Sequence, residues 1–147
     1  MAPIRLGLLV FLPLVLMGLV TSRAQAPDTH EQAKNRAQSA AESWLALADE
    51  GNSGESWEAA AEPFRQRVAQ EGWATTLDDL RGDLGSISSR SLVMAQFRRG
   101  VEGASGGGPF VLLKYRSTAE ETRVQELVLT VKEDDAWAVA GYQVTPL

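Results

Sequence analysis

The sequence has no cysteine and a single histidine, His30. The missing cysteine excludes disulfide bonds, thiolate nucleophiles, thiolate metal sites and a lipid-modified cysteine. A zinc site is also disfavoured, because such sites usually combine several His and Cys ligands. A catalytic base needs a fixed partner and a shielded site, whereas His30 stands at a predicted helix start, so we interpret it as an exposed residue. We predict no cofactor and no bound metal.

Positive charge is also scarce: 14 Lys and Arg stand against 19 Asp and Glu, which gives a formal charge of −5. Removing residues 1–24 takes away Arg5 and Arg23 and no acid, so the remaining chain carries −7. Phosphate binding depends on Lys and Arg contacts. We therefore predict no nucleic-acid partner and no membrane association of the mature chain.

The sequence has no apolar run long enough to span a bilayer. Leu6–Val20 has 15 residues and contains a proline, against roughly 20 that a spanning helix needs. A positive charge before it and small residues after it are typical of a signal peptide. Cleavage after Ala24 is favoured over Ala26, because a proline follows Ala26. We predict a signal peptide at 1–24, one α+β domain at 25–147, and a periplasmic or secreted protein.

Three segments repeat apolar residues at spacings of three and four, which predicts amphipathic helices. The segments are Thr29–Gly51, Ser53–Gly72 and Trp73–Gly85. The first opens with a capping-box pattern, and Ser53 is a predicted N-cap of the second. Pro63 is expected to kink or split the second helix. Each segment closes on a glycine, a residue that commonly ends helices.

Strand-like sequence follows the last helix. Strands are predicted at Ser91–Val101, Phe110–Tyr115, Val124–Lys132 and Trp137–Val144. The Gly- and Ser-rich stretch 103–109 and the pair Asp134-Asp135 are predicted connections. Helices followed by strands with short turns indicate the α+β class. We predict three N-terminal helices packed on one face of a four-stranded antiparallel meander.

An ordered set of residues spread over Ala40 to Val144 resembles one known family. The set comprises Trp44-Leu45, Asp49, Gly51, Ser56-Trp57, Ala60, Phe64, Trp73, Leu77, Arg81, Leu84-Gly85, Arg90, Val111 to Tyr115, Ser117, Trp137, Val139 and Gly141-Tyr142. The family is the exported bacterial domain of unknown function 4019. The chain departs from it at Asn52, where an aromatic is frequent, and at Ala138, where a basic residue is frequent.

The resemblance implies an exported protein with helices on a curved antiparallel sheet, broadly similar to cone-shaped nuclear-transport-factor-2-like domains. The family has no agreed activity, so the resemblance transfers no catalytic residue.

Aromatic and basic residues are the candidate binding groups. Aromatic side chains at helical spacing usually form core, but they can also line an apolar pocket. Arg81 and Arg90 can bond carbonyls and carboxylates within the fold, or bind an anionic ligand. The candidate ligand-binding residues are Trp44, Trp57, Trp73, Arg81, Arg90, Trp137 and Tyr142.

The leading prediction is a non-enzymatic, small-ligand-binding domain of the cell envelope, whose partner is a small molecule or an envelope protein. The first alternative is a protein-interaction module that uses a sheet edge or face. The second is an enzyme of the ketosteroid-isomerase type, which requires a carboxylate of raised pKa in an apolar pocket. Glu126 is the candidate for that carboxylate. Ser56 is interpreted as a helix-start hydroxyl, since no histidine base is predicted near it.

Overall fold

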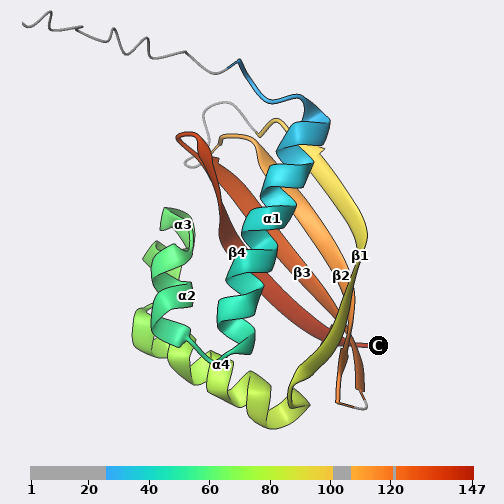
Figure 1. Ribbon diagram of the computed structural model, residues 1–147. Helices are drawn as coiled ribbons and strands as arrows, with labels where there is room; N and C mark the ends of the chain where they lie inside the picture. The colour runs from blue at the N-terminus through green and yellow to red at the C-terminus, as the bar shows by residue number, and fades with distance from the viewer. Residues whose placement is uncertain (1–25, 101–106, 121) are drawn as a thin grey trace, which may run out of the picture.

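The computed structural model describes residues 26–100, 107–120 and 122–147 (Figure 1). The predicted signal peptide and most of the predicted Gly- and Ser-rich connection lie outside the described residues. The elements are α1 (His30–Asp49), α2 (Ser53–Ala59), α3 (Glu62–Arg67), α4 (Gln70–Leu84), β1 (Ile87–Arg98), β2 (Phe110–Ala119), β3 (Thr122–Glu133) and β4 (Ala136–Pro146). All the described helices lie on one side of the sheet, which confirms the α+β class.

Helix α1 runs across the inner face of the sheet (Figure 1). The predicted capping box is present, because the Thr29 side chain accepts from the Gln32 N–H and the Gln32 side chain accepts from the Thr29 N–H. Ala33, Ala37 and Ala41 are fully buried, and such small side chains let the helix approach the strands closely. The helix ends before Gly51, whose φ of 78° favours glycine.

The predicted second helix is two short helices, so the expected number of three helices was wrong and the expected split at Pro63 is confirmed. Pro63 lies in the first turn of α3, where a missing N–H costs no hydrogen bond. The extended backbone before α3 lets the Ala61 N–H donate to the Val139 carbonyl of β4 at 2.8 Å. The break therefore places the helical layer against the edge of β4.

Two further helix boundaries differ from prediction. Asn52, not Ser53, is the N-cap of α2, and its side chain makes no capping hydrogen bond. Gly72 lies inside α4 rather than ending a helix. A solvent-facing glycine costs a helix only about 1 kcal/mol relative to alanine, and the buried Trp73 and Leu77 of the same helix outweigh that cost.

The sheet is a meander of order β1-β2-β3-β4 with every pair antiparallel. Strand β1 begins at Ile87 rather than Ser91, because its polar start pairs with the end of β2, as in Ser89 opposite Thr118. The other strands are also longer than predicted. Inward-facing residues alternate along β2 and β3 and form the core with α1, among them Val111, Leu113, Val124 and Val128.

Candidate functional site

Four aromatic side chains pack together between the helices and the sheet. The ring centroids of Trp44 lie 5.4 Å from those of Trp73 and Tyr142, and Phe64 lies 5.4 Å from Trp73. Ser56 is fully buried among them. Its carbonyl accepts from the Trp44 indole at 2.7 Å, and its hydroxyl accepts from the Trp73 indole at 2.8 Å. Ser56 therefore supplies the polar partners that two buried indoles need.

The structure brings only some of the predicted binding residues together. Trp44, Trp73 and Tyr142 share the aromatic cluster, and Trp57 stands apart, half-buried, with its indole donating to the Val68 carbonyl at 2.7 Å. Trp137 is buried near the start of α1, against Ala33. The rings of the cluster contact one another directly, so they pack as core. A ligand contact by these aromatic residues stays a prediction.

Arg90 joins three parts of the fold. From β1 its Nε donates to Glu126 Oε2 at 2.7 Å and its Nη2 donates to Glu126 Oε1 at 2.9 Å. The same guanidinium donates to both carboxylate oxygens of Asp49, at 2.8 and 3.1 Å. Asp49 is the last residue of α1 and Glu126 lies on β3. All three guanidinium nitrogens are thus engaged, and Arg90 ties the end of α1 to the sheet.

Glu126 is fully buried and accepts four hydrogen bonds. Besides the two from Arg90, it accepts one from the Tyr142 hydroxyl at 2.7 Å and one from the Ser117 hydroxyl. Burial by itself raises the pKa of the Glu126 carboxyl, but the hydrogen bonds from Arg90, Ser117 and Tyr142 outweigh it and lower the pKa. Burial, followed by the adjacent Glu126 charge, raises the pKa of Tyr142.

This arrangement does not favour proton transfer by Glu126. An enzyme of the ketosteroid-isomerase type requires a carboxylate whose pKa is raised, and the pKa of Glu126 is shifted the other way. Its oxygens are already bonded to an arginine and two hydroxyl groups. The arrangement instead stabilises a buried charge by pairing it on several sides.

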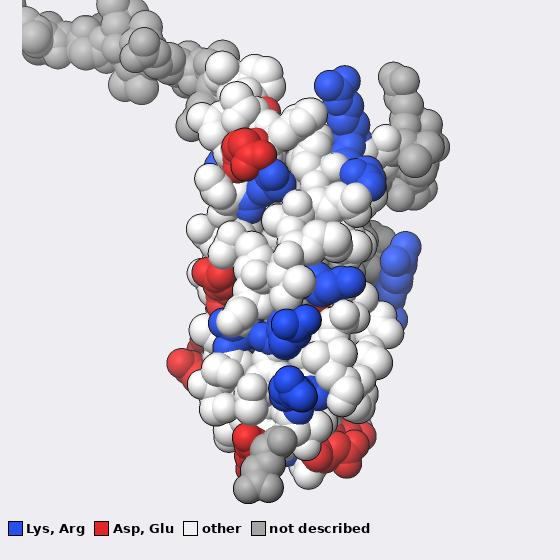
Figure 2. Space-filling model, turned by 90° about the vertical axis from the view of Figure 1, so that its right-hand side faces the viewer, with Lys and Arg blue, Asp and Glu red and all other residues white. Residues whose placement is uncertain are grey.

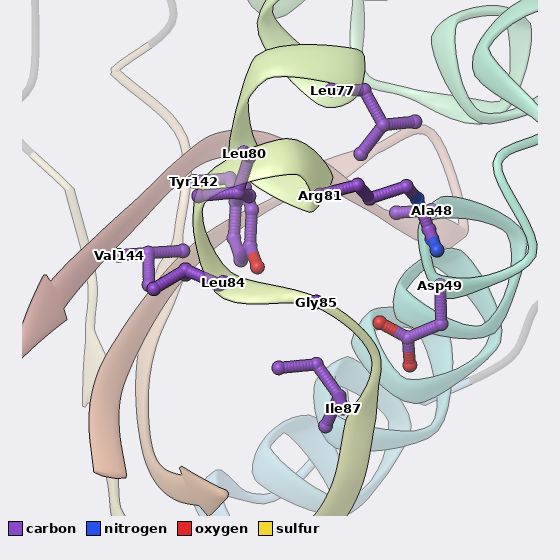
Figure 3. Close-up of a pocket in the computed structure, with 10 residues that line it drawn as sticks. All are labelled: Ala48, Asp49, Leu77, Leu80, Arg81, Leu84, Gly85, Ile87, Tyr142 and Val144. Carbon is purple, nitrogen blue, oxygen red and sulfur yellow. The ribbon is translucent and has the colours of Figure 1, made fainter. Parts of the chain in front are cut away.

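Arg81 lines a small cleft between α4, the end of α1 and the strand ends (Figure 3). Leu77, Leu80 and Leu84 of α4 line it together with Ile87 and Val144. Figure 3 shows the Arg81 side chain reaching across the cleft toward Ala48 and Asp49. The space open to water in this cleft is about 20 Å³, which holds roughly one water molecule. The cleft is therefore nearly closed in this conformation.

The face of the sheet turned away from the helices, here called the outer face, is not covered by any described helix (Figure 1). Strand alternation along β2 and β3, and the pairing of β1 with β2, assign residues to this face. They include Met94, Gln96, Arg98, Phe110, Leu112, Lys114, Arg116, Thr118, Arg123, Gln125, Leu127, Leu129 and Val131.

The remaining chemical candidates are unremarkable in their surroundings. His30 is exposed and its ring stacks on Phe97 with centroids 4.4 Å apart. Over residues 26–100, 107–120 and 122–147, no group of three or more His, Cys, Asp or Glu side chains is placed to hold a metal ion. None of the described helices is long and apolar enough to cross a membrane.

Sequence reasoning selected Arg90 but did not find its partners. Glu126 occupies an inward-facing position between Val124 and Val128, and an acid in an alternating buried row signals a paired charge. Asp49, at the end of a helix, carried no comparable signal, because its pairing with Arg90 depends on the tertiary fold.

The model of a family described as protein of unknown function (DUF4019) matches residues 40–142. No curated protein matches the chain.

Proposed function

This chain belongs to the family of proteins of unknown function DUF4019, and from its fold we propose that it is a protein-interaction module of the cell envelope that docks an acidic partner on the outer face. The observation that carries the proposal is an uncovered sheet face with an apolar centre and basic charge in an otherwise acidic chain. The envelope location rests on the predicted signal peptide.

The apolar centre of the outer face lies on the two central strands. Leu112 of β2 stands directly opposite Leu129 of β3, and Phe110 stands opposite Val131. These side chains are partly exposed and are not among those that pack on the core. Contiguous apolar surface of this kind is typical of a site that another molecule covers.

The charged residues of the outer face are the basic Arg98, Lys114, Arg116 and Arg123, and one acid, Glu133, at the end of β3. Glu133 accepts a hydrogen bond from the Glu62 N–H of α3. Between residues 26 and 85, which form the helical layer, acids clearly outnumber bases. Figure 2, which views the molecule from the β1 side of Figure 1, shows basic side chains across the middle and acidic ones mainly at the left margin and lower end. This distribution favours an acidic partner over a basic or neutral one.

The same charges argue against two copies meeting through their outer faces. A two-fold contact places the same patch on both sides, so Lys114 and Arg116 of one copy would lie near the basic residues of the other. Like charges brought together in this way oppose association. The occupant that fits best is a protein segment that presents carboxylates around apolar side chains.

We place the function here rather than on the aromatic residues for a physical reason. The rings of Trp44, Trp73 and Tyr142 pack on one another, and both indole N–H groups bond to Ser56. Binding a ligand among them requires separating these contacts.

Site-specific photo-crosslinking in the source cell tests the proposal. Leu112 on the outer face is replaced by p-benzoylphenylalanine, and Thr75, exposed on α4, receives the same residue as a matched control. We expect a protein crosslink from position 112 and none from position 75. Crosslinks from position 75 alone, no crosslink at all, a crosslink to phospholipid, or one to a second copy of the chain would each overturn the proposal.

A further inference from the structure

We infer that a pocket beside the start of α1 binds a small carboxylic acid that carries one aromatic ring. The start of α1 lies over the end of the sheet at which β1 finishes (Figure 1). The pocket there, here called the Trp137 pocket, has about 260 Å³ open to water. Pockets for drug-sized ligands measure about 300–1,000 Å³, so this one has room for a somewhat smaller molecule. It lies on the inner side of the sheet and is separate from the outer face.

Apolar side chains form most of the wall of the Trp137 pocket. They are Pro27, Ala33, Phe97, Pro109 and Trp137. Phe97 stands opposite the fully buried Val111 and therefore lies on the inner face of the sheet. His30 stacks on the Phe97 ring, with centroids 4.4 Å apart, and holds it in place. Rings and prolines in the wall favour a flat apolar ligand.

Trp137 brings a donor without a partner to this wall. The residue is only 7% exposed, and its indole N–H makes no hydrogen bond to any residue that the structure describes. Buried indole N–H groups usually find a partner, and leaving one unsatisfied costs free energy. An oxygen atom of a molecule packed against Trp137 supplies the acceptor.

The charged part of the lining consists of Lys132, Arg99 and Asp28. Lys132 stands directly opposite Trp137 in the pairing of β3 with β4, so its ammonium group lies beside the apolar wall. Asp28 accepts two hydrogen bonds from Arg36, at 2.8 and 2.9 Å, and a longer one from Lys132, at 3.3 Å. Asp28 is thus held mainly by Arg36. The ammonium group has three N–H donors, and Asp28 is its one acceptor among the described residues, so Lys132 can donate to a ligand as well.

The charges and the walls together define the class of ligand. Arg36 and Lys132 stand against the single acid Asp28, so this cluster is positive in a chain whose formal charge is −5. A positive cluster at the rim of an apolar pocket favours an anion. A carboxylate accepts a charge-assisted hydrogen bond from Lys132, whereas the nearby Asp28 disfavours a doubly charged group such as phosphate. The size and flat walls of the pocket fit one ring behind that carboxylate.

Two sources supply this chemistry: a free aromatic acid, and the C-terminal residue of a peptide. 3-Phenylpropionate represents the first and N-acetyl-phenylalanine the second. 3-Phenylpropanol, which lacks the charge, and acetate, which lacks the ring, serve as comparison probes. The readout is ¹H–¹⁵N NMR of the mature chain, followed at the Trp137 indole N–H. Tighter binding of 3-phenylpropionate identifies the free acid as the source, and tighter binding of N-acetyl-phenylalanine identifies the peptide terminus.

We expect one or both acids to bind saturably, with a Kd of about 1 mM or tighter, and to shift the Trp137 indole N–H. The alcohol should bind about tenfold more weakly or worse, and acetate should cause no shift. No saturable binding of either acid, equal binding of the alcohol, an equal shift with acetate, or binding that leaves the Trp137 indole N–H unmoved overturns the inference.

Two variants should change the affinity in opposite directions. Lys132→Met removes the ammonium group and should weaken binding of the acid by about 10- to 100-fold. Asp28→Asn removes the carboxylate that competes for Lys132 and should tighten binding severalfold. The matched controls are Lys34→Met and Glu31→Gln, an ion pair on α1 that does not line the pocket, and both should bind as the parent does. Unchanged binding in Lys132→Met, or binding in Asp28→Asn that is no tighter than in the parent, overturns the inference.

The probe comparison in the parent protein needs no variant, so it stands even where Lys132→Met does not fold. The experiment also leaves the outer face untouched. Its failure therefore leaves the proposed docking of an acidic partner intact, and the reverse holds as well.

Discussion

Removing the Arg90 guanidinium should cost more stability than removing any exposed arginine. We choose Arg90→Met because methionine keeps the aliphatic stem and removes the charge. The variant leaves the Glu126 carboxyl fully buried, with only the Ser117 and Tyr142 hydroxyl groups as donors. It also releases Asp49, and with it the link between α1 and β1.

Breaking a buried ion pair by removing one partner costs about 3–5 kcal/mol. For a domain of this size that loss lowers Tm by roughly 10–20 °C. The matched control is Arg98→Met on the same strand, because Arg98 is exposed. Its effect should stay within about 0.5 kcal/mol. Urea unfolding followed by tryptophan emission measures both, since Trp44 and Trp73 are buried in the native state.

A second variant separates the charge effect from lost packing. Adding Glu126→Gln to Arg90→Met removes the buried acid that has lost its arginine partner, so the double variant should be more stable than Arg90→Met alone. The reasoning is refuted if Arg90→Met loses no more than Arg98→Met. It is refuted equally if Glu126→Gln fails to recover stability in the Arg90→Met background.

Three further predictions concern pH, a buried hydroxyl and a helix end. The pKa of Glu126 is lowered in the folded chain from its ordinary value of 4.5, so the stability that its ionised carboxyl contributes is complete above that value and is lost as pH falls below it. Glu126→Gln should therefore flatten the acid side of the curve of Tm against pH. An unchanged acid side would contradict the role of Glu126. Ser56→Ala leaves the Trp73 indole without its acceptor and should lower the free energy of unfolding in urea by about 1–3 kcal/mol. Ser88→Ala, at an exposed site, is the control, and an equal loss in both variants would count against the role of Ser56. Gly85→Ala should destabilise the fold by about 1–2 kcal/mol, because the φ of Gly85 is 73° and a Cβ there would overlap the Glu120 side chain. Gly72→Ala should stabilise the fold by up to about 1 kcal/mol, because a Cβ there meets no atom within 4 Å. A change of the same sign in both variants would refute the explanation.

The sequence was sufficient for the class of fold because its local signals agree with the tertiary structure. Helix α1 begins at the predicted capping box of Thr29. The spacing of apolar residues in α1 and α4 and the alternation in β3 match the residues that are buried in the structure. The turn at Asp134-Asp135 is also as predicted, with Asp134 at a φ of 51°. These features depend on residues close in the chain.

The sequence was weaker where a contact joins distant segments. Gly72 was predicted to end a helix, but α4 continues past it, because burial of Trp73 and Leu77 on the same helix stabilises the helix on both sides of the glycine. Asp49 and Glu126 meet on Arg90 only because α1 ends beside β1 and β3. The basic residues of the outer face come from three strands, Arg98 from β1, Lys114 and Arg116 from β2 and Arg123 from β3, so no continuous basic run marked this face in the sequence.

Charge reversal on the outer face tests the central claim most directly. The yield of the protein crosslink from position 112 is measured in Lys114→Glu/Arg116→Glu and in the control Arg65→Glu/Arg67→Glu, which reverses two exposed charges on α3. Docking of an acidic partner predicts a fall of about tenfold or more for the outer-face pair and no change for the α3 pair. An equal yield in both variants, or a loss only in the α3 pair, would contradict it.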